Sequence, residues 1–326
     1  MKPRGFTLIE LMISMLLGVV VIGGALGVIL ANRQSYRINE GLSQVQESAR
    51  TAFELLARDV RQAGVTGCNN DGRVANVLND EGEWWQSWFG LQGYDGAQAD
   101  GAVDFGTASP DNRVPGTDSI LLQGIEGMGH SIVQHELTAA SFRIGAPTSE
   151  IEEADILMVC DFDHAAIFQA TNYSSANVTF EDTGDTVSPG NCSHGLGYPT
   201  VCGNPGNSYV YGSNSQLARV AAVDWYIGDN GRPAEGGRSL YRLRLGATAP
   251  EEIVAGVTDM QLRYRADVSG EFRAAGDVRD WAAVSAVTIT LTLRSADPRI
   301  VTGPTDNSGR LERQFTNIVT LRNRVP

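Results

Sequence analysis

The stretch Gly5-Phe6-Thr7-Leu8-Ile9-Glu10-Leu11-Met12 opens the most apolar part of this 326-residue chain. The 21 residues from Leu11 to Ala31 carry no charge, and as a helix they would span roughly 30 Å, the thickness of the hydrocarbon core of a bilayer. This run is longer than the roughly 7 to 15 apolar residues of an ordinary secretory signal. The basic residues Lys2 and Arg4 precede it and favour a cytoplasmic position for that end. The sequence therefore predicts a membrane-embedded N-terminal helix.

Glu10 is the one charged residue that interrupts the apolar opening. A carboxylate in lipid costs a few kcal/mol, so an acidic residue at this depth is by default a functional residue with a partner. The alternative is that Glu10 lies at the depth of the lipid headgroups. We favour the functional interpretation.

The quoted stretch resembles the type III signal of bacterial type IV prepilins and of type II secretion pseudopilins. The resemblance implies that a prepilin peptidase cuts between Gly5 and Phe6 and methylates the new terminal amine on Phe6. It also implies that Glu10 meets the terminal amine of a neighbouring subunit during assembly. A buried carboxylate and a buried ammonium are each costly in lipid and offset each other when they pair.

Beyond residue 31 the helical pattern becomes amphipathic. Apolar residues recur at steps of mostly three and four, which predicts one helix face packed on a core; they are Ile38, Leu42, Val45, Ala49, Ala52, Leu56 and Ala63. No proline occurs between Pro3 and Pro110, so one helix can run from Phe6 to about Gln62, roughly 85 Å long. Gly64 and Gly67 predict its end.

After Thr117 the sequence period changes to two. Strands are expected at 118–123, 155–161, 165–170, 241–245, 260–264, 287–293 and 315–321. Several of them alternate apolar and polar residues, which is typical of an antiparallel sheet with one covered face. The long helix carries the matching apolar stripe. We therefore expect an α+β fold, in which this helix packs on an antiparallel sheet.

The C-terminal half adds to the resemblance. The segments Gly256–Tyr264, Leu293–Ser295 and Val319–Arg324 are similar to those of PilW-type minor pilins, and this resemblance implies a type IV pilin fold. A J-type minor pseudopilin of type II secretion has a similar layout. Residues 65–117 and 171–217 match nothing known to us, and they are expected to be mostly loops with short elements.

The composition excludes several functions. The chain has 25 Lys and Arg residues against 38 Asp and Glu residues, and its net charge of -13 disfavours broad nucleic-acid binding. Lys2 is the only lysine. A P-loop and Schiff-base catalysis both need an internal lysine, so neither is expected.

The four cysteines, Cys68, Cys160, Cys192 and Cys202, allow three pairings. Export past the inner membrane would place them in an oxidising space. Cys192 and Cys202 bracket a short loop, and their disulfide would contribute about 2 to 3 kcal/mol on the chain-entropy model. Cys68 and Cys160 are then left for each other. A zinc site is the alternative, but the spacing of the cysteines and histidines does not support one.

No arrangement in the sequence predicts catalysis. HExxH, GxSxG and EF-hand spacings are absent, and we expect no enzyme activity, no metal and no cofactor. Asp161, Asp163 and His164 could bind a cation, although a solvated strand end is the simpler interpretation. The aromatic cluster Trp84, Trp85, Trp88 and Phe89 could stack on a ligand, but packing at the edge of a core is commoner.

These observations and the resemblance predict a non-catalytic minor pilin. Its parts would be a leader (1–5), an assembly half of the helix (6–31), an amphipathic half (32–63) and a β-rich periplasmic head (64–326). The resemblance implies four kinds of partner: the prepilin peptidase, the major pilin, other minor pilins and the assembly platform in the inner membrane. The protein would lie in that membrane before assembly and in a cell-surface pilus, the organelle of twitching motility, afterwards. A J-type pseudopilin and a membrane-anchored surface adhesin are the alternatives.

Overall fold

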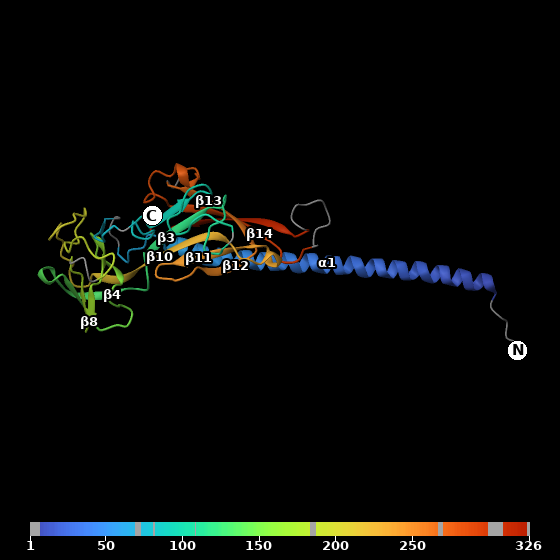
Figure 1. The fold of residues 1–326 in the computed structure, drawn as a ribbon, viewed down its shortest axis with the longest axis horizontal. Coiled ribbons are helices and arrows are strands. Elements are labelled where there is room, and N and C mark those ends of the chain that lie inside the picture. The colour runs from blue at the N-terminus through green and yellow to red at the C-terminus, as the bar shows by residue number, and fades with distance from the viewer. Residues whose placement is uncertain are drawn as a thin grey trace.

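We describe a computed structural model of the chain, which covers residues 7–68, 73–80, 82–107, 109–182, 187–266, 270–298 and 309–324. One long helix, α1 (Leu8–Gln62), projects from a β-rich head (Figure 1). Its 55 residues form one helix because no proline interrupts them. The described part of the head contains little helix. Its three short 3-10 helices are Leu137–Ala139, Pro233–Glu235 and Ala275–Asp277. The α+β fold expected from the sequence is confirmed.

The larger of two sheets has twelve strands in the described part of the chain, and nearly all of its pairs are antiparallel. Its strands are β1 (Val74–Asn76), β2 (Leu91–Tyr94), β3 (Ser119–Ile125), β4 (His130–Glu136), β5 (Ser141–Ile144), β6 (Ile156–Cys160), β7 (Ala165–Gln169), β8 (Asn172–Ser174), β9 (Asn177–Thr179), β10 (Gln216–Asp229), β11 (Arg238–Arg244) and β12 (Glu251–Ala255). One pair, β1 with β7, is parallel.

The smaller sheet has three antiparallel strands in the order β13 (Val257–Arg265), β14 (Ala286–Arg294) and β15 (Glu312–Thr320). On β14 the apolar residues from Val287 to Leu293 are buried, and the threonines between them are more exposed. This alternation covers one face of the sheet and leaves the other in contact with solvent. The sequence predicted a single antiparallel sheet with one covered face. The described head has such a sheet and also the larger, twelve-stranded sheet.

Strand β10 connects the two regions of the head. Its first residues, 216–219, pair with β6 at the distal end, and residues 220–225 pair with β3. Residues 223–229 pair with β11, closer to the helix. This 14-residue strand is the longest in the described chain, but the sequence did not predict it. It is covered on both faces, so its sequence does not alternate between apolar and polar residues.

The second half of α1 packs against β3, β12, β14 and β15. The main core lies between this half and both sheets, and Leu56, Trp225 and Leu291 are fully buried in it. Burial on α1 begins at Gly41. Ile38, which the sequence placed on the buried face, is 38% exposed, because no described part of the head buries it.

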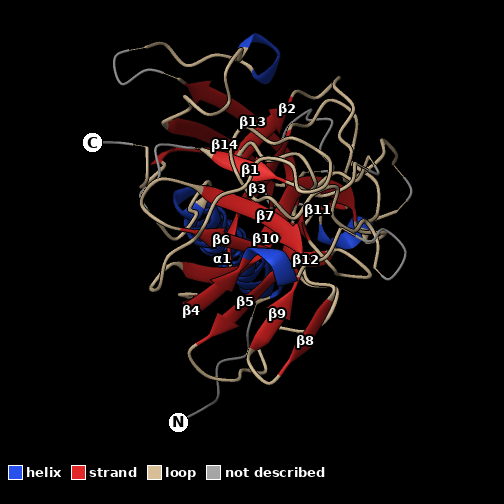
Figure 2. Ribbon diagram, turned by 90° about the vertical axis from the view of Figure 1, so that its left-hand side faces the viewer, coloured by secondary structure: helices blue, strands red, loops and turns tan. Residues whose placement is uncertain are grey.

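A second core lies in the distal part of the head, whose strands β4, β5, β8 and β9 face the viewer in Figure 2. It is built around Phe142, Phe168 and Phe180, which are all fully buried. The ring centroids of Phe142 and Phe180 lie 4.9 Å apart. The head is therefore stabilised by two apolar clusters, and only the first depends on the helix.

The end of the described chain is held against the end of α1. The side-chain amide of Asn323 donates to the carbonyl oxygen of Gly64 at 2.7 Å. The guanidinium group of Arg324 donates to the carbonyl oxygens of Phe89 at 2.9 Å and Trp281 at 2.6 Å. These contacts hold residues 323 and 324 against the C-terminal end of α1 and the loops beside it.

Candidate processing and assembly site

The start of α1 is stabilised by a capping box formed by Thr7 and Glu10. A carboxylate oxygen of Glu10 accepts hydrogen bonds from the backbone N–H and the hydroxyl of Thr7, both at 3.0 Å. The Thr7 hydroxyl oxygen accepts from the backbone N–H of Glu10 at 3.3 Å. Glu10 is exposed in the single chain. Its carboxylate is therefore held at the helix start, where it can be reached by another molecule.

Gly5 and Phe6, the residues expected at the cleavage site, lie outside the described residues. Thr7 is the first residue of the quoted stretch that the structure describes, and α1 begins at the next residue, Leu8. The expected roles of Gly5 and Phe6 therefore remain predictions.

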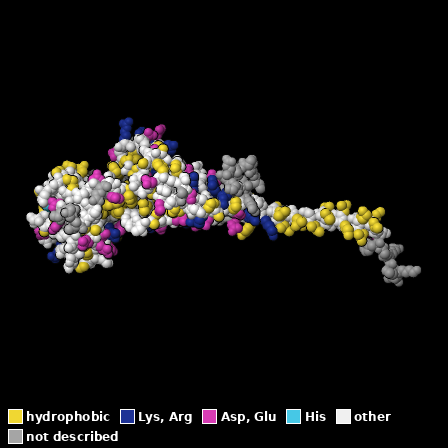
Figure 3. Space-filling model, viewed as in Figure 1, with side chains coloured by type: hydrophobic (Ala, Val, Ile, Leu, Met, Phe, Trp, Pro, Cys, Tyr) yellow, Lys and Arg dark blue, Asp and Glu magenta, His cyan; other side chains and the backbone are white. Residues whose placement is uncertain are grey.

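The first half of α1 is surrounded by no other part of the described chain. Its most apolar window of 18 residues has a mean hydropathy of 2.6, and none of that window is buried. By length and composition the helix can cross a membrane. Figure 3 shows hydrophobic side chains along this projecting half, whereas acidic and basic side chains are spread over the head.

A row of glycines leaves this half of the helix open to close packing. Gly18, Gly23, Gly24 and Gly27 have no atom of another residue in contact with the position where a side chain would begin. Gly23 and Gly27 form a GxxxG spacing, which lets two helices approach closely in a membrane. The chain itself supplies no partner for this surface among its described residues.

The four cysteines form two disulfides. Cys68, just after α1, is bonded to Cys160 at the end of β6, and Cys192 is bonded to Cys202. These are the same pairings as expected from the sequence. The first links the end of the helix to the large sheet across 92 residues of chain, and the second closes a loop of the distal core. With every cysteine bonded, none is left as a zinc ligand.

The other polar groups singled out in the sequence have structural roles. Asp161 accepts from the backbone N–H groups of Asp163 and His164, both at 2.9 Å, and from the hydroxyl of Tyr209 at 2.8 Å. Asp163 forms an ion pair with Arg73 at 2.9 Å. These contacts occupy the carboxylate oxygens of Asp161 and Asp163 that a bound cation would require. Among the residues that the structure describes, no group of His, Cys, Asp and Glu side chains is arranged to hold a metal.

The aromatic cluster packs mainly on the protein. Trp85 and Trp88 are partly buried against the apolar cluster that contains Met158 and Ile167. Phe89 is 39% exposed. Packing at the edge of the core, the favoured interpretation of this cluster, describes the two tryptophans well.

The sequence analysis missed a buried polar cluster under the loop before β3. The guanidinium group of Arg113 is fully buried and lies 3.7 Å from a carboxylate oxygen of Asp100. Arg113 also donates to the Ser119 hydroxyl and to the carbonyl oxygen of Gln98. Asp224, fully buried on β10, shares a side-chain hydrogen bond with Asp100. A lone aspartate in the apolar stretch of β10 was the one signal of this cluster in the sequence.

Burial governs the charge of this cluster. It raises the pKa of Asp224 well above its ordinary value and also raises the pKa of Asp100, while it lowers the pKa of Arg113. Burial therefore favours the neutral form of Asp224, while Asp100 lies 3.7 Å from the guanidinium group of Arg113. The cluster is closed to solvent, and it joins the loop at residues 95–113 to the large sheet.

The comparisons with known proteins bear on the start of the chain. Residues 1–26 match the prokaryotic N-terminal methylation motif. This motif implies processing by a prepilin peptidase and assembly with other pilins. It supports a place in the pilin superfamily and a structural, non-catalytic role. Together with the apolar half of α1, the methylation motif fits a membrane-anchored pilin.

Beyond the methylation motif the comparisons add little. A type IV-like pilin from Thermus thermophilus is similar in structure with 18% sequence identity over 33% of this chain and 67% of that one, at a TM-score of 0.22. A likeness of that size carries no argument about the head. No curated protein matches the sequence.

Proposed function

We propose that this protein is a minor pilin of the PilW type, which is incorporated into a type IV pilus or primes its assembly. The observation that carries the proposal is the methylation motif at the start of a helix whose apolar half lies wholly outside the head. An exposed apolar rod of this length needs lipid before assembly and other helices after it.

In this proposal the chain has four parts. Residues 1–5 are the leader, 6–31 the half of the helix that lies in the membrane and then in the filament, 32–63 the amphipathic half, and 64–326 the head. The exposed helix up to residue 40 and the burial that begins at Gly41 support the division into two halves. The head would lie in the periplasm before assembly and on the cell surface in the pilus.

The partners follow from the same steps. Prepilin peptidase cuts after Gly5 and methylates Phe6. The platform in the inner membrane then lifts the subunit out of the bilayer, and the major pilin and other minor pilins surround its helix. Glu10 pairs with the amine of a neighbouring subunit in this proposal. Its exposed carboxylate supports that role.

The experiment that tests the proposal is mass spectrometry of the mature N-terminus. We expect the protein to begin at methylated Phe6. Loss of Lys2 and Arg4 would then change the formal net charge from -13 to about -15. A mature protein that begins near residue 28, after an ordinary signal peptide, would contradict the pilin role.

A J-type pseudopilin is the second candidate, because its signal resembles the same stretch. Recovery of the protein in sheared pili would support the first candidate. Loss of type II secretion with normal piliation after deletion of the gene would support the second. An adhesin built on the tryptophans is weakened, because Trp85 and Trp88 pack against the core.

A further inference from the structure

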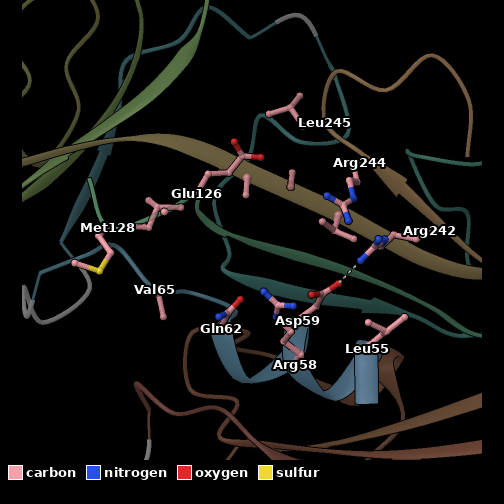
Figure 4. Close-up of a pocket in the computed structure, with 15 residues that line it drawn as sticks. Leu55, Arg58, Asp59, Gln62, Val65, Glu126, Met128, Arg242, Arg244 and Leu245 are labelled. Atoms are coloured by element: carbon pink, nitrogen blue, oxygen red, sulfur yellow. Dashed lines mark ion pairs between the residues drawn. The ribbon is translucent and has the colours of Figure 1, made fainter. Parts of the chain in front are cut away.

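A cavity of about 570 Å³ opens beside the C-terminal end of α1 (Figure 4). Its lining comes from the last turns of the helix, the turn between β3 and β4, the middle of β10 and the end of β11. Because four segments of the chain build it, the fold presents it as one preformed site.

Three guanidinium groups, those of Arg58, Arg242 and Arg244, face this cavity (Figure 4). Arg242 is engaged, since it forms ion pairs with Glu251 at 2.7 Å and with Asp59 at 3.5 Å. Asp59 is engaged as well, because it also accepts from the indole N–H of Trp225 at 3.1 Å. This network sets two carboxylates against the one guanidinium group of Arg242.

The other two guanidinium groups keep most of their hydrogen-bond donors. Arg244 lies 3.9 Å from Glu251, which is beyond hydrogen-bond distance. Arg58 has no ion pair or side-chain hydrogen bond within the part of the chain that the structure describes. A guanidinium group binds a carboxylate through two parallel hydrogen bonds. Arg58 and Arg244 therefore present unused donors to a carboxylate, on the side of the cavity away from Glu126, which also lines it and lies 3.9 Å from Arg219.

Apolar surface lies next to these donors. Leu55, Val65 and Leu245 line the cavity, and Met128 stands at its rim. Met128 is 94% exposed on a turn whose flanking residues, Gly127 and Gly129, have φ of 70° and 76°. Methionine is flexible and polarisable, so it adapts to varied apolar side chains. A ligand that matches both features has a carboxylate beside an apolar group.

The position of the cavity excludes a lipid headgroup as that ligand in the membrane-anchored protein. Arg58 lies 27 residues beyond the end of the apolar run at Ala31, which corresponds to about 40 Å along the helix. This distance is several times the screening length of physiological salt. A protein segment can reach the cavity, whereas the bilayer surface cannot.

We propose that this cavity binds an extended segment of another protein chain in which an Asp or Glu residue is flanked by an apolar one. The carboxylate pairs with Arg58 and Arg244, and the apolar side chain packs on Leu55, Leu245 and Met128. The inference goes beyond the proposed function and does not depend on incorporation into a filament.

Site-directed photo-crosslinking in cells that produce the full-length protein tests this inference. A benzoylphenylalanine is placed at Met128, and in a separate variant at Phe162, which is 84% exposed on the distal part of the head. We expect a cross-linked product at Met128 that is absent at Phe162. Mass spectrometry of its peptide should find Asp or Glu next to an apolar residue at the point of attachment.

Charge reversal tests the role of the guanidinium groups. Arg58→Glu and Arg244→Glu should each lower the yield at Met128 about tenfold, since an attractive charge pair becomes a repulsion. Arg58→Gln should lower it by a smaller factor. Arg61→Glu is the matched control, because it makes the same change on α1 outside the cavity. Lysine in place of the partner's acidic residue should restore the yield with Arg58→Glu.

Several results would overturn the inference: no product at Met128, a product without a carboxylate near the attachment point, a product with lipid, or equal loss with Arg61→Glu. Non-reducing peptide mapping of both disulfides checks that each variant is folded. Filament incorporation is measured separately. A chain that forms the expected product but never enters filaments would contradict the pilin role and leave this inference intact.

Discussion

Glu10 combines two roles that a pair of substitutions can separate. Its carboxylate caps the helix start through Thr7, and in the proposed assembly it also neutralises a neighbour's amine. Glu10→Gln keeps an oxygen acceptor for the cap but removes the charge, whereas Glu10→Ala removes both. We expect both variants to be processed and to remain in the membrane, and neither to appear in sheared pili.

Ser14→Ala is the matched control for this comparison. Its hydroxyl donates to the carbonyl oxygen of Leu11 one turn back, so the substitution removes a polar group without a charge. It should be incorporated normally. Normal incorporation of Glu10→Gln would show that the cap, and not the charge, is what assembly needs.

His135 makes the distal core sensitive to acid. Its Nδ1 accepts from the backbone N–H of Tyr211 at 3.1 Å, and its ring lies 4.3 Å from that of Phe142. Burial lowers the pKa of His135 from 6.5 to about 4. Between these values the unfolded chain binds a proton that the folded chain does not, so stability falls as the pH falls from 6.5 to 4. Below pH 4 this loss is complete.

The expected loss is up to about 3 kcal/mol, because each pKa unit corresponds to about 1.36 kcal/mol. Urea unfolding of the full chain in detergent at pH 7 and pH 4.5 measures it. His135→Asn keeps an acceptor for Tyr211 and should make the distal core less dependent on pH. His130→Asn, a change at a partly exposed histidine, should not. An NMR titration that placed the pKa of His135 near 6.5 would refute this account.

At the scale of single residues, some buried groups could not be foreseen from the sequence. Asp100, Arg113 and Asp224 meet across more than 100 residues of chain, and only the fold brings them together. Glu10 was recognisable because a charge within an apolar run is conspicuous whatever the fold. The cavity residues Arg58 and Arg244 lie on a helix and a strand whose positions relative to each other no local pattern specifies.

The amphipathic half of α1 forms one wall of the main core, and this leads to a prediction at the scale of elements. Burial begins at Gly41, so a chain that starts at residue 33 should fold as a soluble monomer with both disulfides. A chain that starts after Leu56 exposes the apolar face of β14 and β15 and should aggregate. Size-exclusion chromatography with light scattering measures both outcomes.

The control for the truncation is the chain that starts at residue 41, which should behave like the longer one. Peptide mapping without reduction should recover Cys68 with Cys160 and Cys192 with Cys202. Four free thiols in periplasmic protein, or a soluble monomer that lacks residues 1–56, would contradict the role assigned to the helix.

Strands β13 and β14 have one covered face, and they alternate and were expected within a few residues of their ends, as was β15. Strands β6 and β7, which are buried almost throughout, were also expected. Strand β10 is buried on both faces, and the short strands β8 and β9 carry too few residues to show a period. The distal core was missed as a unit, because it combines the expected strands β6 and β7 with β1, β4, β5 and β9, which were not expected.

For the whole molecule, the shape of the head favours a low-copy subunit near the tip of a pilus. A shaft stacks one helix after another, so every head repeats at the same close spacing. This head extends well beyond the end of α1 into a distal part with its own core (Figure 1). Such a part would crowd its neighbours in a shaft, whereas a tip leaves one side free.

Quantitative mass spectrometry of sheared filaments measures this prediction. We expect the protein at a small fraction of the abundance of the major pilin, and we expect its deletion to reduce piliation and twitching. Complementation with Ser14→Ala should restore both, and complementation with Glu10→Ala should not. Abundance equal to that of the major pilin, or an unchanged deletion strain, would remove the minor-subunit role.

The packing of α1 on the last strands of the chain also has a consequence during synthesis. The ribosome makes the helix first, but β15, which covers part of its buried face, begins at Glu312, about 250 residues after Gln62. At roughly 5 to 20 residues per second, this delay lasts about 10 to 50 s. Throughout that interval the apolar face of α1 that includes Leu56 is not fully covered by strands. In the proposed function this interval falls during export, so the nascent chain must be shielded by the bilayer surface or by a periplasmic chaperone until its final strand arrives.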